Sequence, residues 1–490
     1  MPVHLRLPAS LLPACCLLAA CSGPAPVPPA LPPAPSQWQA GAQAPIVAMD
    51  DWWQRFNDPV LDALVRRAQQ NSFDLAAAIA RVEQARAQAR VAGAAGLPTV
   101  QLGLNATRER LMHGPGYSAI DTYQDDPGLE TYSLGLSASY EVDFWGGVRA
   151  RAASAVSTWQ ASLFDQSALR LSLEADVAQA YLAVRAQQAR LEVARQNLKN
   201  AEQVLALVQT RHGAGAATAL ELAQQRGLTA RQRQQQALLH QQAANAEVTL
   251  ATLLGVAAGQ LALPPGGFEQ LHWPSIGAGV PSQLLTRRPD VARAEARLAA
   301  ADADVQVARA MMLPRLTLTA SLAGGANQAS DLLLNRYYDV GGALLAPIFN
   351  AGALRAQHQA SQARREELLA GYRKAVVDAF ADTDRALNDA QGLDAQLGWQ
   401  EEALAQARTT FELAERRYRA GAESLLTMLD AQRSLFEAQD TGIQLRLARL
   451  NASVGLYKAL GGGWQQRAPG ATPAAGAQAS PDGPPTPTQD

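Results

Sequence analysis

The feature that most constrains the fold of this chain is an internal repeat that covers most of its length. Asp74–Pro98 and Asp290–Pro314 have the same spacing at an offset of 216 residues, and alternating apolar and polar residues follow each proline. Further along, "RHGAGAATAL" from Arg211 matches "RYRAGAESLL" from Arg417 at an offset of 206. The copies therefore stay in register, except for a ten-residue change of the kind that loops accommodate.

Each copy predicts the same order of elements: helix, strand, loop, strand, long helix, break and helix. The first copy is expected over residues 74–280 and the second over 290–463. Strict alternation of apolar and polar residues predicts two strands per copy. These strands are expected near residues 99–107, 131–143, 315–324 and 338–349. The clearest is "TYSLGLSASYEVD", where six apolar residues from Tyr132 to Val142 share one face.

The segment between Val148 and His212 contains neither glycine nor proline, and its apolar residues recur every three or four positions. This pattern predicts one amphipathic helix about 100 Å long. A matching helix is expected over Ala353–Ala420. Helices of this length pack side by side as coiled coils, and the breaks near Gly215 and Gly421 are expected to reverse the chain.

The sequence thus predicts a mainly α protein with a small β part, and the small number of strands constrains its assembly. An alternating strand faces a core in a soluble sandwich, or lipid in a transmembrane barrel. Four strands leave two edges without partners, which lipid does not permit, and single-chain barrels need about eight strands. Three copies supply twelve strands. We therefore expect a homotrimer with a twelve-stranded transmembrane β-barrel and a coiled-coil helical barrel.

The N-terminus has the layout of a secretory signal, with weak positive charge followed by a short apolar run. We expect a signal peptide over residues 1–20, because Leu18–Cys21 resembles a bacterial lipobox and makes Cys21 the predicted lipidation site. An ordinary signal cleaved nearby is the alternative. A Pro/Ala-rich tether is expected over 21–47, the body over 48–463 and a disordered tail over 464–490.

Charge and motifs exclude several classes of function. Lys and Arg number 42 against 44 Asp and Glu, so no basic stripe for nucleic acid is expected. The six histidines are scattered without the spacing of metal ligands, and the sequence contains no GxxxxGK[ST], HExxH or GxSxG motif. We expect no enzyme activity, no catalytic residue, no cofactor and no metal site.

Two further clusters have an interpretation from their position. The "WWQRF" segment, with Trp52, Trp53 and Phe56, follows the tether and precedes a helix. We expect it to pack onto the helical body, although a belt at the membrane interface is the alternative. The pair Arg287 and Arg288 before a proline is interpreted as a solvated turn.

Several segments together resemble the outer membrane factor family, the TolC-type exit ducts, and in particular its NodT-like lipoprotein branch. They occur in the family's order between Asp51 and Gly463, and the most specific are "DDWWQRFNDPVLDALVRRAQQNSFDL", "SYEVDFWGGVRA", "APIFNAGALRAQ" and "RYRAGAESLLTMLDAQRSLFEAQ". The resemblance implies a trimeric exit duct of a tripartite efflux or secretion system. Its partners would be outer membrane lipid, a periplasmic adaptor protein and an inner-membrane transporter.

The resemblance also implies site residues at the periplasmic end of the duct. The turns at Gly215 and Gly421 match the expected adaptor contacts, and four residues match the gate: Glu221, Tyr418, Leu426 and Asp430. The chain departs from the TolC-type pattern at Glu423, where an arginine helps to lock the gate, and at Thr427, where a second aspartate stands. These departures put the locking contacts in doubt, and a solvated helix end is the alternative.

Two alternative functions share part of the pattern. A coiled-coil structural lipoprotein of the outer membrane, without transport activity, has similar long helices but no need for lipid-facing strands. A diffusion porin is mostly strand, whereas this sequence predicts mostly helix.

Overall fold

The computed structural model describes residues 30–39, 51–110 and 128–464 of the 490-residue chain. The predicted signal peptide, Cys21 and most of the predicted tail lie outside the described residues. The chain forms two compact units. The first comprises Met1–Pro33, Ala80–Leu163 and Arg293–Val377, and the second comprises Ala34–Ile79, Phe164–Ala292 and Asp378–Asp490.

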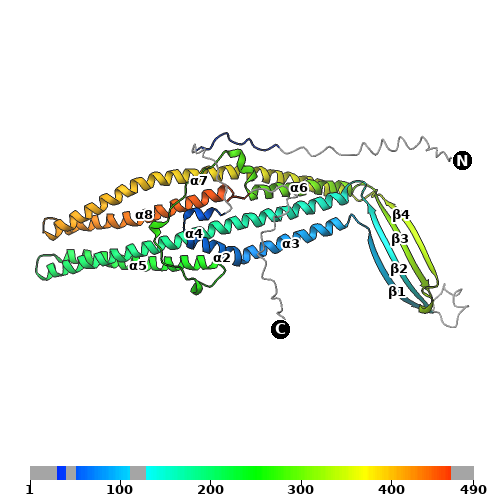
Figure 1. Cartoon of the computed structure of the whole chain (residues 1–490), viewed down its shortest axis with the longest axis horizontal. Coiled ribbons are helices and arrows are strands. Elements are labelled where there is room, and N and C mark those ends of the chain that lie inside the picture. Colours follow the sequence, from blue (N-terminus) through cyan, green and yellow to red (C-terminus); the bar gives the residue numbers. More distant parts are fainter. Residues whose placement is uncertain (1–29, 40–50, 111–127, 465–490) are drawn as a thin grey trace, which may run out of the picture. The chain divides into compact units, whose positions relative to one another are not determined.

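The predicted repeat appears as two pairs of helices of equal length (Figure 1). The long helices are α4, Gly147–Gly213, and α7, Ala353–Arg419, each of 67 residues. Each is followed by a helix of 35 residues, α5 at Ala219–Leu253 and α8 at Leu425–Ala459. All four helices keep the sequence offset of 206, so the repeat is structural as well as sequential.

Shorter helices precede the strands of each repeat. Helix α2, Pro59–Asn71, lies just before the first repeat. Helix α3, Phe73–Ala94, precedes the strands of the first repeat, and α6, Pro289–Ala310, precedes those of the second. Five 3-10 helices complete the described helical segments: η1 Trp52–Phe56, η2 Ala258–Gln260, η3 Phe268–Gln270, η4 Pro281–Thr286 and η5 Ala329–Asp331. Within the described ranges, no helix combines the length and the apolar character needed to cross a membrane.

The four strands form one antiparallel sheet in the order β1-β2-β3-β4 (Figure 1). Their bounds are β1 Thr99–Arg110, β2 Gly128–Val142, β3 Arg315–Ala326 and β4 Arg336–Leu345. The first three lie close to the predicted strands. The last ends at Leu345, four residues before the predicted end, after which the chain passes through Pro347. The predicted fold class, mainly helical with a small four-stranded part, is confirmed.

The "WWQRF" cluster packs in the core of the second unit, as predicted. Trp52, Trp53 and Phe56 are almost fully buried, and Trp52 stacks on Tyr457 of α8 with ring centroids 5.1 Å apart. Indole and phenyl rings of this size bury more apolar area than any aliphatic side chain. The alternative of an interface belt is therefore wrong, because these side chains are covered by the chain itself.

Helix α2 begins at Pro59 because the residue before it is a good cap. The Asp58 carboxylate accepts hydrogen bonds from the amides of Val60 at 2.8 Å and Leu61 at 3.4 Å. Its other oxygen accepts a 2.6 Å bond from the Tyr181 hydroxyl of α4. Burial, together with this carboxylate, raises the pKa of Tyr181 to about 12. One aspartate thus both starts α2 and ties it to α4.

Part of the predicted tether is packed. Trp38 is 3% exposed, and its indole Nε1 donates a 2.8 Å hydrogen bond to the carbonyl of Gly279. The next amide, of Gln39, donates to the Asp384 carboxylate of α7 at 3.0 Å. A buried indole with its N–H satisfied is a strong attachment point. The chain around Trp38 is therefore packed within the second unit.

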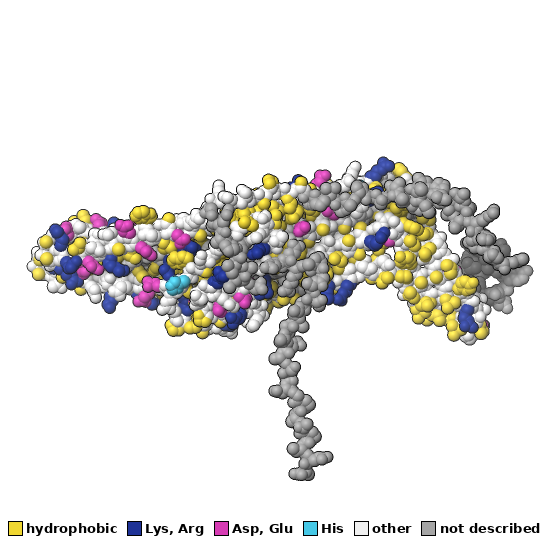
Figure 2. Space-filling model, turned by 45° about the horizontal axis from the view of Figure 1, so that its top comes forward, with side chains coloured by type: hydrophobic (Ala, Val, Ile, Leu, Met, Phe, Trp, Pro, Cys, Tyr) yellow, Lys and Arg dark blue, Asp and Glu magenta, His cyan; other side chains and the backbone are white. Residues whose placement is uncertain are grey.

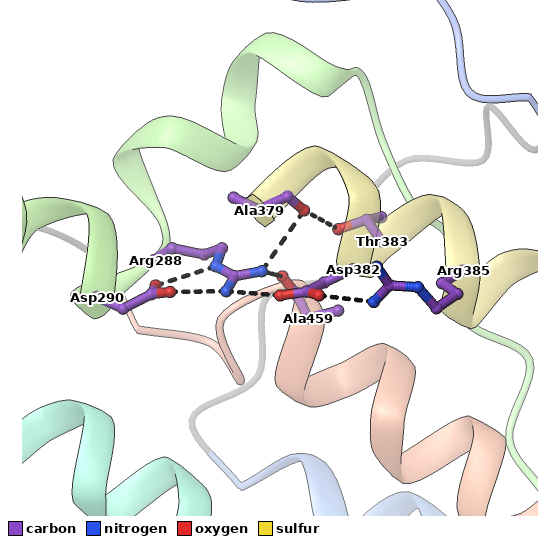
Figure 3. A network of polar contacts seen from close by, with 7 residues as sticks. All are labelled: Arg288, Asp290, Ala379, Asp382, Thr383, Arg385 and Ala459. Atoms are coloured by element: carbon purple, nitrogen blue, oxygen red, sulfur yellow. Dashed lines mark hydrogen bonds and ion pairs between the residues drawn. The ribbon is translucent and has the colours of Figure 1, made fainter. Parts of the chain in front are cut away.

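Arg288 corrects the interpretation of the basic pair as a solvated turn. Its side chain is buried, and its Nη2 donates to Asp290 at 2.7 Å and to Asp382 of α7 at 3.2 Å (Figure 3). Its Nη1 donates to the carbonyls of Ala379 at 3.5 Å and of Ala459, the last residue of α8, at 3.3 Å. A guanidinium is suited to this position because it carries five N–H donors in a fixed geometry. Its positive charge is also stabilised near the C-terminus of a helix, here that of α8.

We expect Arg288→Met to lower the free energy of unfolding by about 2 kcal/mol, because it removes a buried guanidinium that donates to two carboxylates and two carbonyls. Thermal unfolding of the purified protein measures the effect. Burial by itself would raise the pKa of Asp290, but Arg288 outweighs burial and lowers it. The stabilisation is therefore present above an unfolded aspartate's pKa of about 3.9 and is lost as the pH falls through the lower folded value.

The matched control is Arg385→Met. Arg385 also pairs with Asp382, at 3.0 Å, but its side chain is 68% exposed. We expect it to change stability by less than about 0.5 kcal/mol. Equal losses in both variants, or a loss for Arg288→Met that persists unchanged at pH 2, would contradict the assignment.

Candidate functional site

The register of the sheet places most of the apolar side chains of the four strands on one face. One row across the strands consists of Leu102, Leu136, Leu322 and Tyr338, which pair in succession. Their exposed fractions are 72%, 47%, 58% and 79%. Figure 2 shows hydrophobic side chains gathered over this part of the molecule. An exposed apolar face of this extent needs a cover, because monomeric soluble proteins rarely expose one.

The opposite face of the sheet is mainly polar, although Tyr337 and Leu345 of β4 also lie on it. The row adjacent to the apolar one consists of Gln101, Ser137, Ser321 and Asp339, and the Ser321 hydroxyl donates to the Asp339 carboxylate. The face is concave, and small residues such as Gly103 and Gly135 line its hollow. The two faces are therefore suited to different surroundings, one apolar and one aqueous.

The sheet has two edges that its own strands leave uncovered. In the described part of the chain, β1 pairs only with β2 and β4 pairs only with β3. The segment after β4 is especially exposed, with Ile348 at 92% and Phe349 at 89%. Backbone donors and acceptors on such edges bind another strand readily, and in lipid they require one.

The two chain reversals at the ends of the long helices share one geometry. Gly215 and Gly421 have φ values of 73° and 75°, in the left-handed region where glycine is least strained. The same two backbone hydrogen bonds close each turn. In the first turn the amide of Gly215 donates to the carbonyl of His212 at 3.0 Å, and that of Ala216 to the carbonyl of Arg211 at 2.7 Å. In the second turn the amide of Gly421 donates to the carbonyl of Tyr418 at 3.0 Å, and that of Ala422 to the carbonyl of Arg417 at 2.9 Å. A Cβ atom at either glycine would meet nothing within 4 Å, so both turns are open to a partner.

The structure brings two of the predicted gate residues together. Tyr418 is 3% exposed, and the Arg211 guanidinium lies over its ring, 4.9 Å from the centroid. The pKa of Tyr418 is raised, mainly because its side chain is buried. The charge of Arg211 opposes this rise, and the charge of Glu221 adds to it. Glu221 also forms a capping box with Thr218 at the start of α5, accepting from its amide at 2.6 Å. Arg211 and Tyr418 thus join α4 to α7, and the charge of Glu221 at the start of α5 acts on Tyr418.

The other two predicted gate residues lie exposed at the start of α8. Leu426 is 57% exposed, and Asp430 is exposed with Arg433 of its own helix 3.5 Å away. Glu423, which departs from the family pattern, pairs with Arg417 of the same chain at 3.4 Å. The amide of Ser424 also donates to Glu423 and lowers the pKa of its carboxyl. Glu423 thus has a partner for its negative charge within its own chain.

Arg211 is a site residue that the sequence analysis did not single out. An arginine near a helix end is usually solvated, and no local pattern distinguishes this one. The usable signal is the repeat, since Arg211 and Arg417 occupy equivalent positions just before the two turns. Among the described residues, no group of three or more His, Cys, Asp or Glu is placed to hold a metal ion.

Residues 64–256 and 280–462, one segment from each repeat, match the outer membrane efflux protein family. The chain is 55% identical over 459 residues to the pyoverdine export outer membrane protein OpmQ of Pseudomonas aeruginosa, covering 93% of this chain and 97% of that one. It is 49% identical over 471 residues to OpmQ of Pseudomonas putida, covering 96% and 99%. The solved outer-membrane channel OprN superposes with a TM-score of 0.83 at 29% identity, covering 91% of this chain and all of OprN.

The chain therefore belongs to the outer membrane efflux protein family, a family of channels. Its function is that of an outer-membrane exit duct in efflux, as the sequence predicted. The two-faced sheet and the long paired helices are the parts that such a duct requires.

We expect Leu136→Arg to prevent the protein from accumulating in the outer membrane, whereas Ser137→Arg is tolerated. The two residues are neighbours on β2, and only Leu136 lies on the apolar face. A charge facing lipid near the bilayer midplane costs about 2–4 kcal/mol, while the opposite face is aqueous. Membrane fractionation with quantification of folded protein measures the difference. Equal loss in both variants would contradict the assignment of faces.

Proposed function

We propose that the duct is a homotrimer in which three four-stranded sheets close into one twelve-stranded barrel. The observation that carries the proposal is the pair of uncovered sheet edges, bordered by an exposed apolar face. Closure by sister copies gives every edge group a partner and turns all apolar rows toward lipid. The helices of the three copies then form a coiled-coil tunnel in the periplasm.

The internal repeat specifies how the copies join. Within one chain, β2 of the first repeat pairs with β3 of the second, with Val142 opposite Leu316. Adding 206 to Val142 gives its equivalent in the second repeat, Ile348, which follows the end of β4. Subtracting 216 from Leu316 gives its equivalent in the first repeat, Val100. The proposed trimer therefore places Ile348 of one copy opposite Val100 of the next. The same register places Leu344 opposite Leu104. These residues are exposed in the single chain, at 92%, 62%, 70% and 72%, respectively.

We expect the double variant Leu344→Cys, Leu104→Cys to form disulfides between copies. The native cysteines lie within the first 21 residues, which keeps the background low. Directly opposed residues on neighbouring strands have Cβ atoms about 4.5–5.5 Å apart, close enough for a strained or slightly shifted bridge. Denaturing gels without reductant should show covalent trimers.

The register control is Leu344→Cys with Val100→Cys, four residues further along β1, which should stay monomeric on the same gel. Cross-linking of the control instead of the first pair would contradict the register. Absence of cross-links in both, together with a monomeric mass in detergent, would overturn the trimer. Channel conductance in liposomes then separates the duct from a structural lipoprotein, which would be silent.

We further propose that the open turns at Gly215 and Gly421 bind a periplasmic adaptor, which links the duct to an inner-membrane transporter. Support comes from the empty space around both glycines. Gly421→Ala and Gly421→Trp carry the same backbone strain, but only the tryptophan blocks a docked partner. Equal adaptor pull-down by both variants would remove this assignment.

The gate is proposed at the exposed start of α8. Three copies of Leu426 form an apolar constriction that resists wetting, and three copies of Asp430 form an acidic ring that favours cations. Tyr418 and Glu221 support the constriction from the adjoining helices.

We expect Leu426→Ala to raise the conductance of purified channels in planar bilayers, and Asp430→Asn to lower their preference for cations over anions. Leu413→Ala, at an exposed leucine on α7 away from the turn, is the control and should change neither property. Unaltered conductance and selectivity in the first two variants would leave these residues as a solvated helix end.

The anchor and the substrate complete the proposal. We assign lipidation to Cys21, and radiolabelled palmitate that still enters a Cys21→Ser variant would remove the assignment. The high identity to two pyoverdine exporters supports pyoverdine as the substrate. Expression of this chain in Pseudomonas aeruginosa lacking OpmQ should restore pyoverdine export, and failure despite normal folding would point to another substrate.

A further inference from the structure

Beside the apolar residues that pack the two repeats together near the helix turns, one polar pair of side chains joins them, and the repeat implies a second, equivalent pair. We propose that Arg417 of one copy binds His212 of the next copy and latches the periplasmic turns of neighbouring copies together. The inference rests on the trimer proposed above and adds the residues that hold its closed end.

The pair within the chain supplies the geometry. The guanidinium of Arg211, on α4, lies 4.9 Å from the ring centroid of Tyr418, on α7. Its Nη1 also donates a 3.0 Å hydrogen bond to the Tyr418 carbonyl. A cation over an aromatic face with a hydrogen bond to the adjoining backbone is a specific contact between two helices. It joins the first repeat to the second, close to both turns.

The offset of 206 makes Arg417 the equivalent of Arg211, and His212 the equivalent of Tyr418. The four backbone bonds and the two φ values of the turns agree, so the equivalence holds in the structure. Tyr418 is buried under Arg211, whereas Arg417 and His212 are both exposed. Such a difference follows if their partners belong to other copies.

A ring of three copies alternates first and second repeats. The side of the second repeat that carries Arg417 therefore meets the side of the next first repeat that carries His212. Each interface between copies then repeats the interface within the chain. The closed end would hold three Arg211–Tyr418 contacts and three Arg417–His212 contacts.

Local contacts already hold Arg417 at the turn. Its Nε pairs with Glu423 at 3.4 Å and its Nη2 donates to the Ala422 carbonyl at 3.4 Å. A guanidinium carries five N–H donors, so these contacts are compatible with a further bond. An imidazole offers both a ring face and a nitrogen acceptor, the two features that Arg211 uses in the Tyr418 side chain and backbone.

A second position shows how the interfaces differ. Arg190 of α4 forms a two-pronged ion pair with Asp440 of α8, at 2.6 Å and 3.0 Å. The equivalent residues are Gln396 and Gln234, which are exposed. Two amides form a neutral contact that is weaker than a charged one. At this position the interface between copies is therefore weaker than the interface within the chain, and we expect opening to begin between copies.

The contact is tested by proximity in the full-length protein. His212→Cys with Arg417→Cys, treated with a short bismaleimide, should yield covalent dimers and trimers on denaturing gels, and each single-cysteine variant should not. If the Leu344–Leu104 cross-link forms but the turn cross-link does not, the latch is overturned and the trimer stands. If neither forms, both proposals fail.

The latch is tested by channel recordings on variants that preserve folding. Arg417→Gln removes the contact from all three interfaces, so it should raise the open fraction by at least about fivefold, the effect of losing a single cation–π contact of about 1 kcal/mol. His212→Tyr, which recreates the chemistry of the Arg211–Tyr418 pair, should lower the open fraction. Arg416→Gln is the control, because Arg416 bonds to Glu412 of its own helix. An open fraction that neither Arg417→Gln nor His212→Tyr changes would overturn the latch even if the cross-link forms.

Discussion

The need of backbone N–H and C=O groups for partners is the constraint on which the rest of this structure depends. Four strands satisfy one another internally but leave β1 and β4 each with an open edge. In water such an edge could be hydrated, but an apolar face on the same sheet excludes water there. The sheet is therefore incomplete in a single chain, and the helices, the repeat and the turns follow from an assembly in which neighbours complete it.

The repeat reduces the number of interfaces that the sequence must specify. Because α4 and α7 have the same length, as do α5 and α8, one geometry would serve both within the chain and between the copies of the proposed trimer. A residue that differs between the repeats would then affect either the interface within the chain or the interface between copies. Arg190 and Asp440 strengthen the contact within the chain, while Gln396 and Gln234 would make the equivalent contact between copies neutral. Stability and movement can thus be assigned to different interfaces.

Much of the fold could be predicted from the sequence because its patterns are long and regular. Alternation over six apolar positions fixed β2, and a run without glycine or proline fixed α4. Residues whose environment comes from distant segments could not be predicted in this way. Arg288 looked like a solvated turn until α7 and α8 supplied Asp382 and the Ala459 carbonyl. Arg211 likewise gained a role only when Tyr418, 207 residues away, was placed against it.

The two residues of α8 that we propose as a gate differ in how they relate to the repeat, and the difference has a physical meaning. Leu426 is equivalent to Leu220, and both are exposed, at 57% and 66%. Asp430 is equivalent to Gln224, so the acidic charge occurs in one repeat only. An apolar seal must surround the whole opening, since water enters through any gap, and in the proposed trimer three copies of Leu220 would add to the three copies of Leu426. A charged ring acts over a longer range, and six carboxylates would repel one another strongly, so three are sufficient to bias the ions that pass.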